Sequence, residues 1–187
     1  MKITTVFLDR DGVLNVDKPD YILRVEDVHL YKDVATAIKQ LSDAGIRIIV
    51  ISNQAGIAKR LLNVETAEAI FEKVIHDAES DGGHISDYYY CPHKDEDACV
   101  CRKPRTGLFE QAVREYGLLL EETVFVGDGY GDAGAAHRLG IPFYLVDQGR
   151  GFETRKKCDA GGQLYIWVDN LQDAVQQILK TNKGNNK

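Results

Sequence analysis

Apolar and polar positions follow two different periods along the chain, and these periods predict strands and helices in alternation. Short apolar runs, several rich in β-branched residues, are typical of strands covered on both faces. They lie at residues 3–8, 46–51, 88–90, 123–126, 141–146 and 164–168. Apolar residues spaced three and four apart predict helices at 33–44, 64–78, 107–116, 131–139 and 171–179. Gly45 and Gly140 follow two of these helices, where a helix commonly ends.

This order of elements predicts an α/β fold, a Rossmann-like doubly wound parallel sheet with helices on both faces. The 187 residues suit a single domain, 1–187, with one core. Only about 20 residues separate the first strand from the first helix, and an independent cap domain needs at least about 50, so we expect a minimal cap. Segment 149–162 is rich in Gly, Arg and Lys, and we predict a solvated loop there rather than a mobile flap. The polar tail 181–187 is expected to fray.

Composition narrows the possible partners. The formal net charge of -6 argues against a nucleic-acid backbone as the main partner. A local cluster of Arg and Lys can still bind a small anion although the net charge of the chain is negative. No apolar run approaches the roughly 20 residues of a membrane span, and the N-terminal residues do not resemble a signal peptide. We therefore expect a cytoplasmic protein that does not bind a membrane.

Polar residues follow three of the predicted strands. Asp9 and Asp11 end the first strand, Ser52 follows the second, and Asp128 follows the strand at 123–126. Any single Asp at such a position commonly caps a turn or a helix. The carboxyl ends of parallel strands share one crevice, however, and carboxylates gathered there repel one another unless a cation lies among them. The combination predicts a Mg²⁺ site that also receives a substrate phosphate.

The irregular segment 80–106 predicts a second metal site. Its stretch CPHKDEDACVCRKP supplies three thiolates and one imidazole, which is a complete tetrahedral shell for Zn²⁺: Cys91, His93, Cys99 and Cys101. Four protein ligands leave no open position, so the zinc would be structural. The alternative is a set of reduced thiols without metal beside a surface histidine. Arg102 and Lys103 follow the last ligand directly, and zinc would fix their position.

These motifs, in this order, resemble the haloacid dehalogenase superfamily of phosphohydrolases, over residues 3 to about 146. The matching residues are Asp9-x-Asp11-Gly12-Val13, Ser52, Lys103 and Gly127-Asp128-x-x-x-Asp132. The resemblance implies that Asp9 is the nucleophile and forms an aspartyl-phosphate, while Asp11 protonates the leaving alcohol and then activates water.

The same resemblance implies roles for the remaining motif residues. Ser52 and Lys103 would hold the phosphoryl oxygens. Mg²⁺ would bind Asp9, Asp128 and the backbone carbonyl of Asp11. For Asp132 two roles stay open, an outer partner of the metal or an acid at a helix N-terminus.

The cysteine segment resembles the zinc-containing branch of this superfamily, which acts on heptose 1,7-bisphosphate or on histidinol phosphate. The stretches SNQAGIAKR (52–60) and DYYYCPH (87–93) favour removal of the 7-phosphate of the heptose, in nucleotide-heptose biosynthesis for lipopolysaccharide. The resemblance implies that the sugar contacts Asp17, Tyr21, Asn53 and Gln54, and that Arg102 contacts the distal phosphate. Gly129 departs from this pattern, since it stands where the branch has a lysine.

Three alternatives remain at this point. Histidinol phosphate, or another small phosphorylated sugar, would use the same chemistry with a different leaving group. An inactive zinc-stabilised binding domain is a different class, but it predicts loss of the acids or of Lys103, and all are present. A zinc-redox switch at Cys99 and Cys101 would predict that oxidation releases the metal. The minimal cap predicts an open site in a monomeric enzyme.

Overall fold

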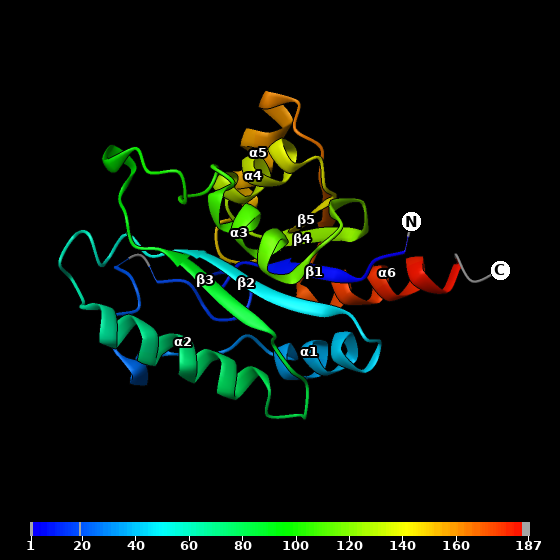
Figure 1. The fold of residues 1–187 in the computed structure, drawn as a ribbon, viewed down its shortest axis with the longest axis horizontal. Coiled ribbons are helices and arrows are strands. Elements are labelled where there is room, and N and C mark those ends of the chain that lie inside the picture. The colour runs from blue at the N-terminus through cyan, green and yellow to red at the C-terminus, as the bar shows by residue number, and fades with distance from the viewer. Residues whose placement is uncertain (1, 19, 185–187) are drawn as a thin grey trace.

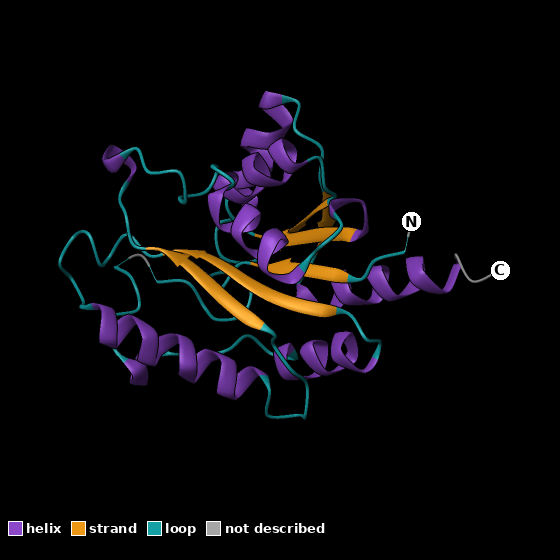
Figure 2. Cartoon of the chain, in the orientation of Figure 1, coloured by secondary structure: helices purple, strands orange, loops and turns teal. Residues whose placement is uncertain are grey.

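The structure, a computed structural model, describes residues 2–18 and 20–184, and its centre is a parallel sheet (Figures 1 and 2). The strand order is β3-β2-β1-β4-β5-β6, and each neighbouring pair is parallel. The strands are β1 (Thr5–Leu8), β2 (Arg47–Asn53), β3 (Asp87–Cys91), β4 (Thr123–Gly127), β5 (Phe143–Val146) and β6 (Ile166–Val168). The predicted Rossmann-like α/β fold is confirmed.

Helices cover both faces of the sheet (Figure 1). One face carries α1 (Val34–Asp43), α2 (Val64–Ala78) and α6 (Leu171–Gly184). The other carries α3 (Gly107–Tyr116), α4 (Tyr130–Leu139) and α5 (Gly151–Gly161). The central strands supply both layers of the core, because successive side chains of a strand point to opposite faces. In β1, Val6 and Leu8 pack toward α1, α2 and α6, whereas Phe7 packs toward α3.

Two segments differ from the sequence prediction. The segment 149–162 is not a solvated loop, because residues 151–161 form α5. The helix buries Thr154 and Cys158 against the sheet and ends at Gly162, which adopts a positive φ. The tail is helical as far as Gly184, because the amide of Asn182 pairs with both backbone polar groups of Ile3. Of the predicted frayed tail, residues 185–187 lie outside the described residues, as does Pro19.

The sheet order creates a switch point between β1 and β4. The chain runs outward from β1 through β2 to β3, and then returns to place β4 on the other side of β1. In open α/β sheets, ligands bind beyond the carboxyl ends of the strands at such a point. Asp9 follows β1 there, and its backbone N–H donates to the carbonyl of Val126 in β4 at 3.0 Å. Asp128 follows β4 directly, so the fold brings the two carboxylates to one crevice.

Candidate active site

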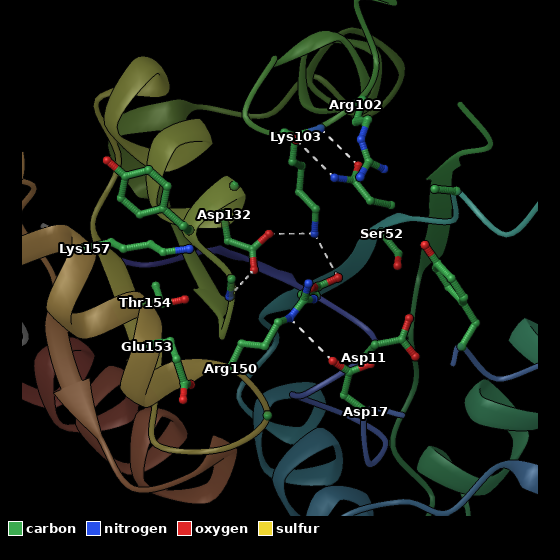
Figure 3. A pocket seen from close by; sticks show the side chains of 18 of the residues that line it. Asp11, Asp17, Ser52, Arg102, Lys103, Asp132, Arg150, Glu153, Thr154 and Lys157 are labelled. Atoms are coloured by element: carbon green, nitrogen blue, oxygen red, sulfur yellow. Dashed lines mark hydrogen bonds and ion pairs between the residues drawn. The ribbon is translucent and has the colours of Figure 1, made fainter. Parts of the chain in front are cut away.

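A buried lysine joins two of the crevice acids. Lys103 Nζ lies 2.8 Å from Asp9 Oδ1 and 2.8 Å from Asp132 Oδ1 (Figure 3). It also donates to the carbonyl of Ile51 at 2.7 Å. Burial alone would lower the pKa of Lys103, but the charges of Asp132 and Asp9 raise it, so the side chain stays cationic. Burial and the neighbouring Asp132 and Asp128 raise the pKa of Asp9 well above its usual range, although Lys103 opposes this.

Three carboxylates fit a divalent cation. Oxygens of Asp9, Asp128 and Asp132 all lie within 4.8 Å of one another. Asp128 is fully buried, and its Oδ1 has no hydrogen-bond partner within the described residues. Burial and the charge of Asp132 raise the pKa of Asp128 to about 7, although Arg150 opposes this. Hard oxygen donors with one orphaned, buried oxygen match what Mg²⁺ takes from proteins, so the residues present fit this metal.

Two glycines allow the backbone to approach Asp128 closely. Gly12 has a φ of +84°, and a Cβ there would lie 2.2 Å from Asp128 Oδ2. A Cβ on Gly149, whose φ is +53°, would also lie 2.2 Å from that oxygen. The next backbone N–H, that of Arg150, donates to Asp128 Oδ2 at 2.7 Å. The chain therefore encloses Asp128 from two sides, which fixes the direction of its free oxygen.

Asp11 is not part of the cluster formed by Asp9, Asp128 and Asp132. It lies instead in a network of hydrogen bonds. Arg10 Nη2 donates to both of its carboxylate oxygens, at 2.9 and 2.8 Å, and Asn15 Nδ2 donates at 2.9 Å. Arg10 is buried, and its guanidinium lies over the Phe71 ring at 4.5 Å. Burial alone would raise the pKa of Asp11, but Arg10 and these hydrogen bonds lower it overall. Asp11 is therefore a carboxylate in this state.

The residues after β2 support the site from behind. Gln54 is buried, and its Nε2 donates to Ser52 Oγ and to Asp11 Oδ2, both at 2.9 Å. Asn53 holds the backbone of Lys103 at both ends, since its Oδ1 accepts from the N–H and its Nδ2 donates to the carbonyl. Ser52 and Asn53 line the pocket, whereas Gln54 orients two of its neighbours.

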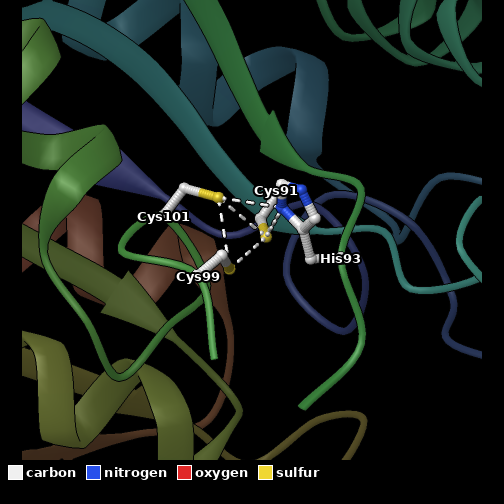
Figure 4. A group of neighbouring side chains, drawn as sticks. All are labelled: Cys91, His93, Cys99 and Cys101. Atoms are coloured by element: carbon white, nitrogen blue, oxygen red, sulfur yellow. Dashed lines mark hydrogen bonds between the residues drawn. The ribbon is translucent and has the colours of Figure 1, made fainter. Parts of the chain in front are cut away.

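The predicted zinc ligands come together at the carboxyl end of β3 (Figure 4). The ligand atoms of Cys91, His93, Cys99 and Cys101 lie within 4.8 Å of one another, and close pairs range from 3.1 to 3.5 Å. These separations are somewhat shorter than the about 3.8 Å between two sulfurs of a tetrahedral zinc, and three thiols with one imidazole are a complete zinc shell, so the residues present fit Zn²⁺. Residues 102 and 103 leave the cluster toward the crevice. Arg102 is held there by Asp95 at 2.5 Å and by the carbonyl of His93 at 3.3 Å.

A cavity of about 710 Å³ opens above these groups. The predicted contacts Asp17, Tyr21, Asn53 and Arg102 line it together with Asp9, Asp11, Ser52 and Lys103. Four further lining residues come from α5 or its first turn, where the sequence predicted only a solvated loop: Arg150, Glu153, Thr154 and Lys157.

Two arginines at the site were missed by the sequence analysis. The sequence did offer a sign of Arg10, because an arginine between two acids at the end of a buried strand must find a partner. The sequence offered no sign of Arg150, because only the packing of α5 brings this residue to the crevice. Its Nε lies 3.4 Å from Asp17 Oδ2 and 3.7 Å from Asp128 Oδ2. Burial alone would lower the pKa of Arg150, but Asp128 and Asp17 raise it overall.

The fold and the site define an α/β protein with a carboxylate cluster that fits a divalent cation at the switch point of its parallel sheet. A family model described as a haloacid dehalogenase-like hydrolase matches residues 3–140. The chain belongs to the haloacid dehalogenase-like hydrolases, and the predicted superfamily is confirmed.

Relatives match nearly the whole chain. A D-glycero-β-D-manno-heptose-1,7-bisphosphate 7-phosphatase from Pseudomonas aeruginosa is 36% identical over 180 residues, which cover 96% of this chain and 100% of that protein. An enzyme named for the α anomer, from Photorhabdus laumondii, is 35% identical over 79% of this chain and 85% of its own length. The crystal structure of D,D-heptose 1,7-bisphosphate phosphatase from B. bronchiseptica, complexed with magnesium and phosphate, has a TM-score of 0.89 and 30% identity. The match covers 97% of this chain and 99% of the chain in that crystal structure.

In the described part of the chain, no helix combines the length and the apolar character needed to cross a membrane.

Proposed function

We propose that this chain is a Mg²⁺-dependent phosphatase that removes the 7-phosphate of D-glycero-D-manno-heptose 1,7-bisphosphate. The observation that carries the proposal is the position of Asp9, which lies between Lys103 and Asp128 at the switch point of the sheet. Two relatives named for this reaction, one for each anomer, support the substrate; their matches cover 96% and 79% of this chain. The product would be heptose 1-phosphate, a precursor for nucleotide-heptose and lipopolysaccharide synthesis.

The first step is the attack of Asp9 on phosphorus. One carboxylate oxygen forms the new bond to phosphorus while the bond to the sugar oxygen breaks, which yields an aspartyl-phosphate and an alcohol. Lys103 lies 2.8 Å from the nucleophile and balances charge on the phosphoryl oxygens, and Ser52 donates a hydrogen bond to them. Magnesium held by Asp9, Asp128 and the Asp11 carbonyl would neutralise further phosphate charge. Asp132 orients Lys103 through their ion pair. Its Oδ2 also accepts a hydrogen bond from the Gly129 N–H at 2.9 Å, which fixes the turn after Asp128.

The second step is hydrolysis of the aspartyl-phosphate. Asp11 accepts a proton from water, which attacks phosphorus and frees Asp9. The carboxylate state that Arg10 and Asn15 impose on Asp11 suits this task. The first step needs the opposite state, since Asp11 must give a proton to the leaving alcohol. We propose that Asp11 takes up this proton when bound substrate loosens its contact with Arg10.

We also propose that residues 1–187 form one catalytic domain, which acts as a monomer in the cytoplasm. The proposed catalytic residues meet at the carboxyl edge of one continuous sheet, which supports a single domain. The proposed zinc segment 91–101 serves that domain, because Arg102 and Lys103 follow it directly. The small phosphorylated sugar is the proposed partner, rather than a nucleic acid or a membrane.

Phosphate release from a substrate panel tests the proposal. The panel contains both anomers of heptose 1,7-bisphosphate, fructose 1,6-bisphosphate and histidinol phosphate, each with Mg²⁺ and with EDTA. Asp9→Asn is the control variant. The proposal requires that a heptose bisphosphate has the highest kcat/KM and that EDTA and Asp9→Asn abolish release. Preference for histidinol phosphate would keep the chemistry and refute the substrate, whereas no release from any substrate would refute the enzyme.

A further inference from the structure

Helix α5 is fixed against the site at its first turn. The backbone N–H of Arg150 donates to Asp128 Oδ2 at 2.7 Å. The residues on either side are glycines without room for a side chain: a Cβ on Gly149 would meet Asp128, and one on Gly151 would lie 1.8 Å from the carbonyl of Val146. The helix that follows is therefore held at the edge of the crevice.

One face of α5 lines the substrate cavity. Arg150, Glu153, Thr154 and Lys157 are spaced three and four apart, so they lie along one side of the helix. Figure 3 shows Glu153, Thr154 and Lys157 on one side of the pocket and Ser52 and Asp11 on the other, while Arg150 extends between them toward Asp17. The two cations between Thr154 and Lys157 in the sequence, Arg155 and Lys156, have partners outside the cavity. Arg155 lies over the ring of Trp167 at 4.7 Å, and Lys156 Nζ lies over the ring of Phe152 at 4.2 Å.

The cations of the cavity differ in how far they are already paired. Lys103 is buried between two carboxylates, and Arg102 is held by Asp95 and by the carbonyl of His93. Lys157, by contrast, has no carboxylate within ion-pair distance among the residues that the structure describes, and its Nζ lies 5.9 Å from the Tyr130 ring centre. Arg150 is more than half exposed and contacts its acids only at 3.4 and 3.7 Å.

A sugar bisphosphate brings two phosphates to this cavity. The reacting phosphate must lie at Asp9, where Lys103 and the metal-binding acids neutralise it. The other phosphate needs cations that are free to bind it, at a distance from Asp9. Gly129 lines the cavity without a side chain, so it offers no charge there. The open cations on α5 supply the missing positive charge.

We infer that Lys157 and Arg150 bind the phosphate that is not cleaved, and so select a bisphosphate over a monophosphate. The inference rests on the proposed function and identifies which residues read its substrate. Arg150 would exchange its contact with Asp17 for the phosphate, while its backbone N–H continues to hold Asp128. Lys157, two turns further along the same face of α5, would bind the same phosphate.

The test compares two substrates that differ only in the distal phosphate, heptose 1,7-bisphosphate and heptose 7-phosphate. The measured quantity is the ratio of their kcat/KM values in Lys157→Met, Arg150→Gln and the double variant. A charge-assisted contact to phosphate predicts that each substitution lowers this ratio about tenfold, mainly through KM for the bisphosphate. Lys157→Arg should retain most of the ratio. Lys156→Met removes the adjacent cation of the same helix and is the matched control, with an unchanged ratio.

The outcomes separate the inference from the proposed function. If Lys157→Met and Arg150→Gln lower kcat/KM equally for both substrates, or for neither, the inference is wrong, because the side chains do not read the distal phosphate. If the wild-type chain prefers fructose 1,6-bisphosphate, the proposed substrate is wrong, but the same ratio against fructose 6-phosphate still tests the inference. Equal ratios in Lys156→Met and Lys157→Met would likewise overturn it, since only general charge would then matter.

Discussion

Lys103 Nζ stands midway between two carboxylates, 2.8 Å from Asp9 Oδ1 and 2.8 Å from Asp132 Oδ1. All three side chains are buried. The lysine therefore compensates the charge of both acids and lies next to the proposed nucleophile. Asn53 pairs with its backbone, and Cys101 of the proposed zinc site lies two residues before it in the chain. The proposed zinc site and the proposed catalytic residues are thus linked through one residue.

Replacing this lysine tests its double role. Lys103→Met should lower kcat by a factor of about 100 to 1,000, because a donor to the phosphoryl oxygens is lost. It should also lower the free energy of unfolding by about 3 kcal/mol, because two buried acids lose their partner. Turnover and urea unfolding measure the two effects. Lys39→Met, which removes an exposed i,i+4 ion pair with Asp43, is the control and should change neither. Full turnover in Lys103→Met would contradict the assignment.

Loss of zinc should reduce activity through the position of Lys103. Cys101→Ser should lower the bound zinc well below one ion per chain, and it should lower kcat with Mg²⁺ in excess, because the segment before Lys103 loses its anchor. Metal analysis and phosphate release on the same sample provide the check. Cys158→Ser removes a buried thiol outside the cluster and should retain the zinc. Unchanged kcat in zinc-free Cys101→Ser would show that the loop does not position the lysine.

The close approach of Gly149 to Asp128 gives a prediction with a matched pair. Gly149→Ala and Gly162→Ala both place a Cβ at positive φ, +53° and +66°, which costs about 1 kcal/mol or more of stability. Of these two positions, only Gly149 brings that Cβ against Asp128, since at Gly162 no atom of the described residues lies within 4 Å. Gly149→Ala should therefore weaken magnesium activation, and Gly162→Ala should not. Magnesium titration of phosphate release measures this. Equal titration curves for the two variants would contradict the geometry.

The pH dependence of magnesium binding follows from Asp128. Its pKa is raised from 3.8 to about 7, mainly by burial and by Asp132. An acid with a raised pKa binds more protons in the folded state, so without metal the protein loses stability as pH rises from 3.8 toward 7. Magnesium competes with that proton, so its stabilising effect should grow over the same range. Thermal unfolding with Mg²⁺ or EDTA at several pH values measures the effect. A magnesium shift that is constant or falls with rising pH would contradict this account.

The sequence was sufficient for most of the fold because the helix and strand periods are distinct. α2 and α3 have the predicted bounds, and the predicted acids meet at the switch point because parallel strands align their carboxyl ends. The segment of α5 was not predicted, since its apolar face consists of little more than Thr154 and Cys158. Such a weak stripe is typical of a helix that depends on tertiary packing rather than on its own sequence.

Details of the site depended on contacts that sequence spacing does not encode. The clustering of Cys91, His93, Cys99 and Cys101 was predictable because four soft donors in a short segment have few other uses, and their role as zinc ligands remains a prediction. Asn53 was predicted as a sugar contact, and the structure shows that its amide also holds Lys103, an interaction across 50 residues. Arg150 reaches Asp17 only because two glycines permit the turn before α5. The sugar contacts of Asp17, Tyr21, Asn53 and Gln54 remain predictions.

Chemical trapping of Asp9 tests the central claim most directly. Enzyme turning over heptose 1,7-bisphosphate with Mg²⁺ is quenched and treated with borohydride, which reduces an aspartyl-phosphate to homoserine. Peptide mass spectrometry then locates the modified residue. We expect homoserine at position 9, dependent on both substrate and Mg²⁺, and absent from Asp9→Asn. Reduction at Asp11 or Asp128 instead, or none at any acid while phosphate is released, would show that Asp9 is not the nucleophile.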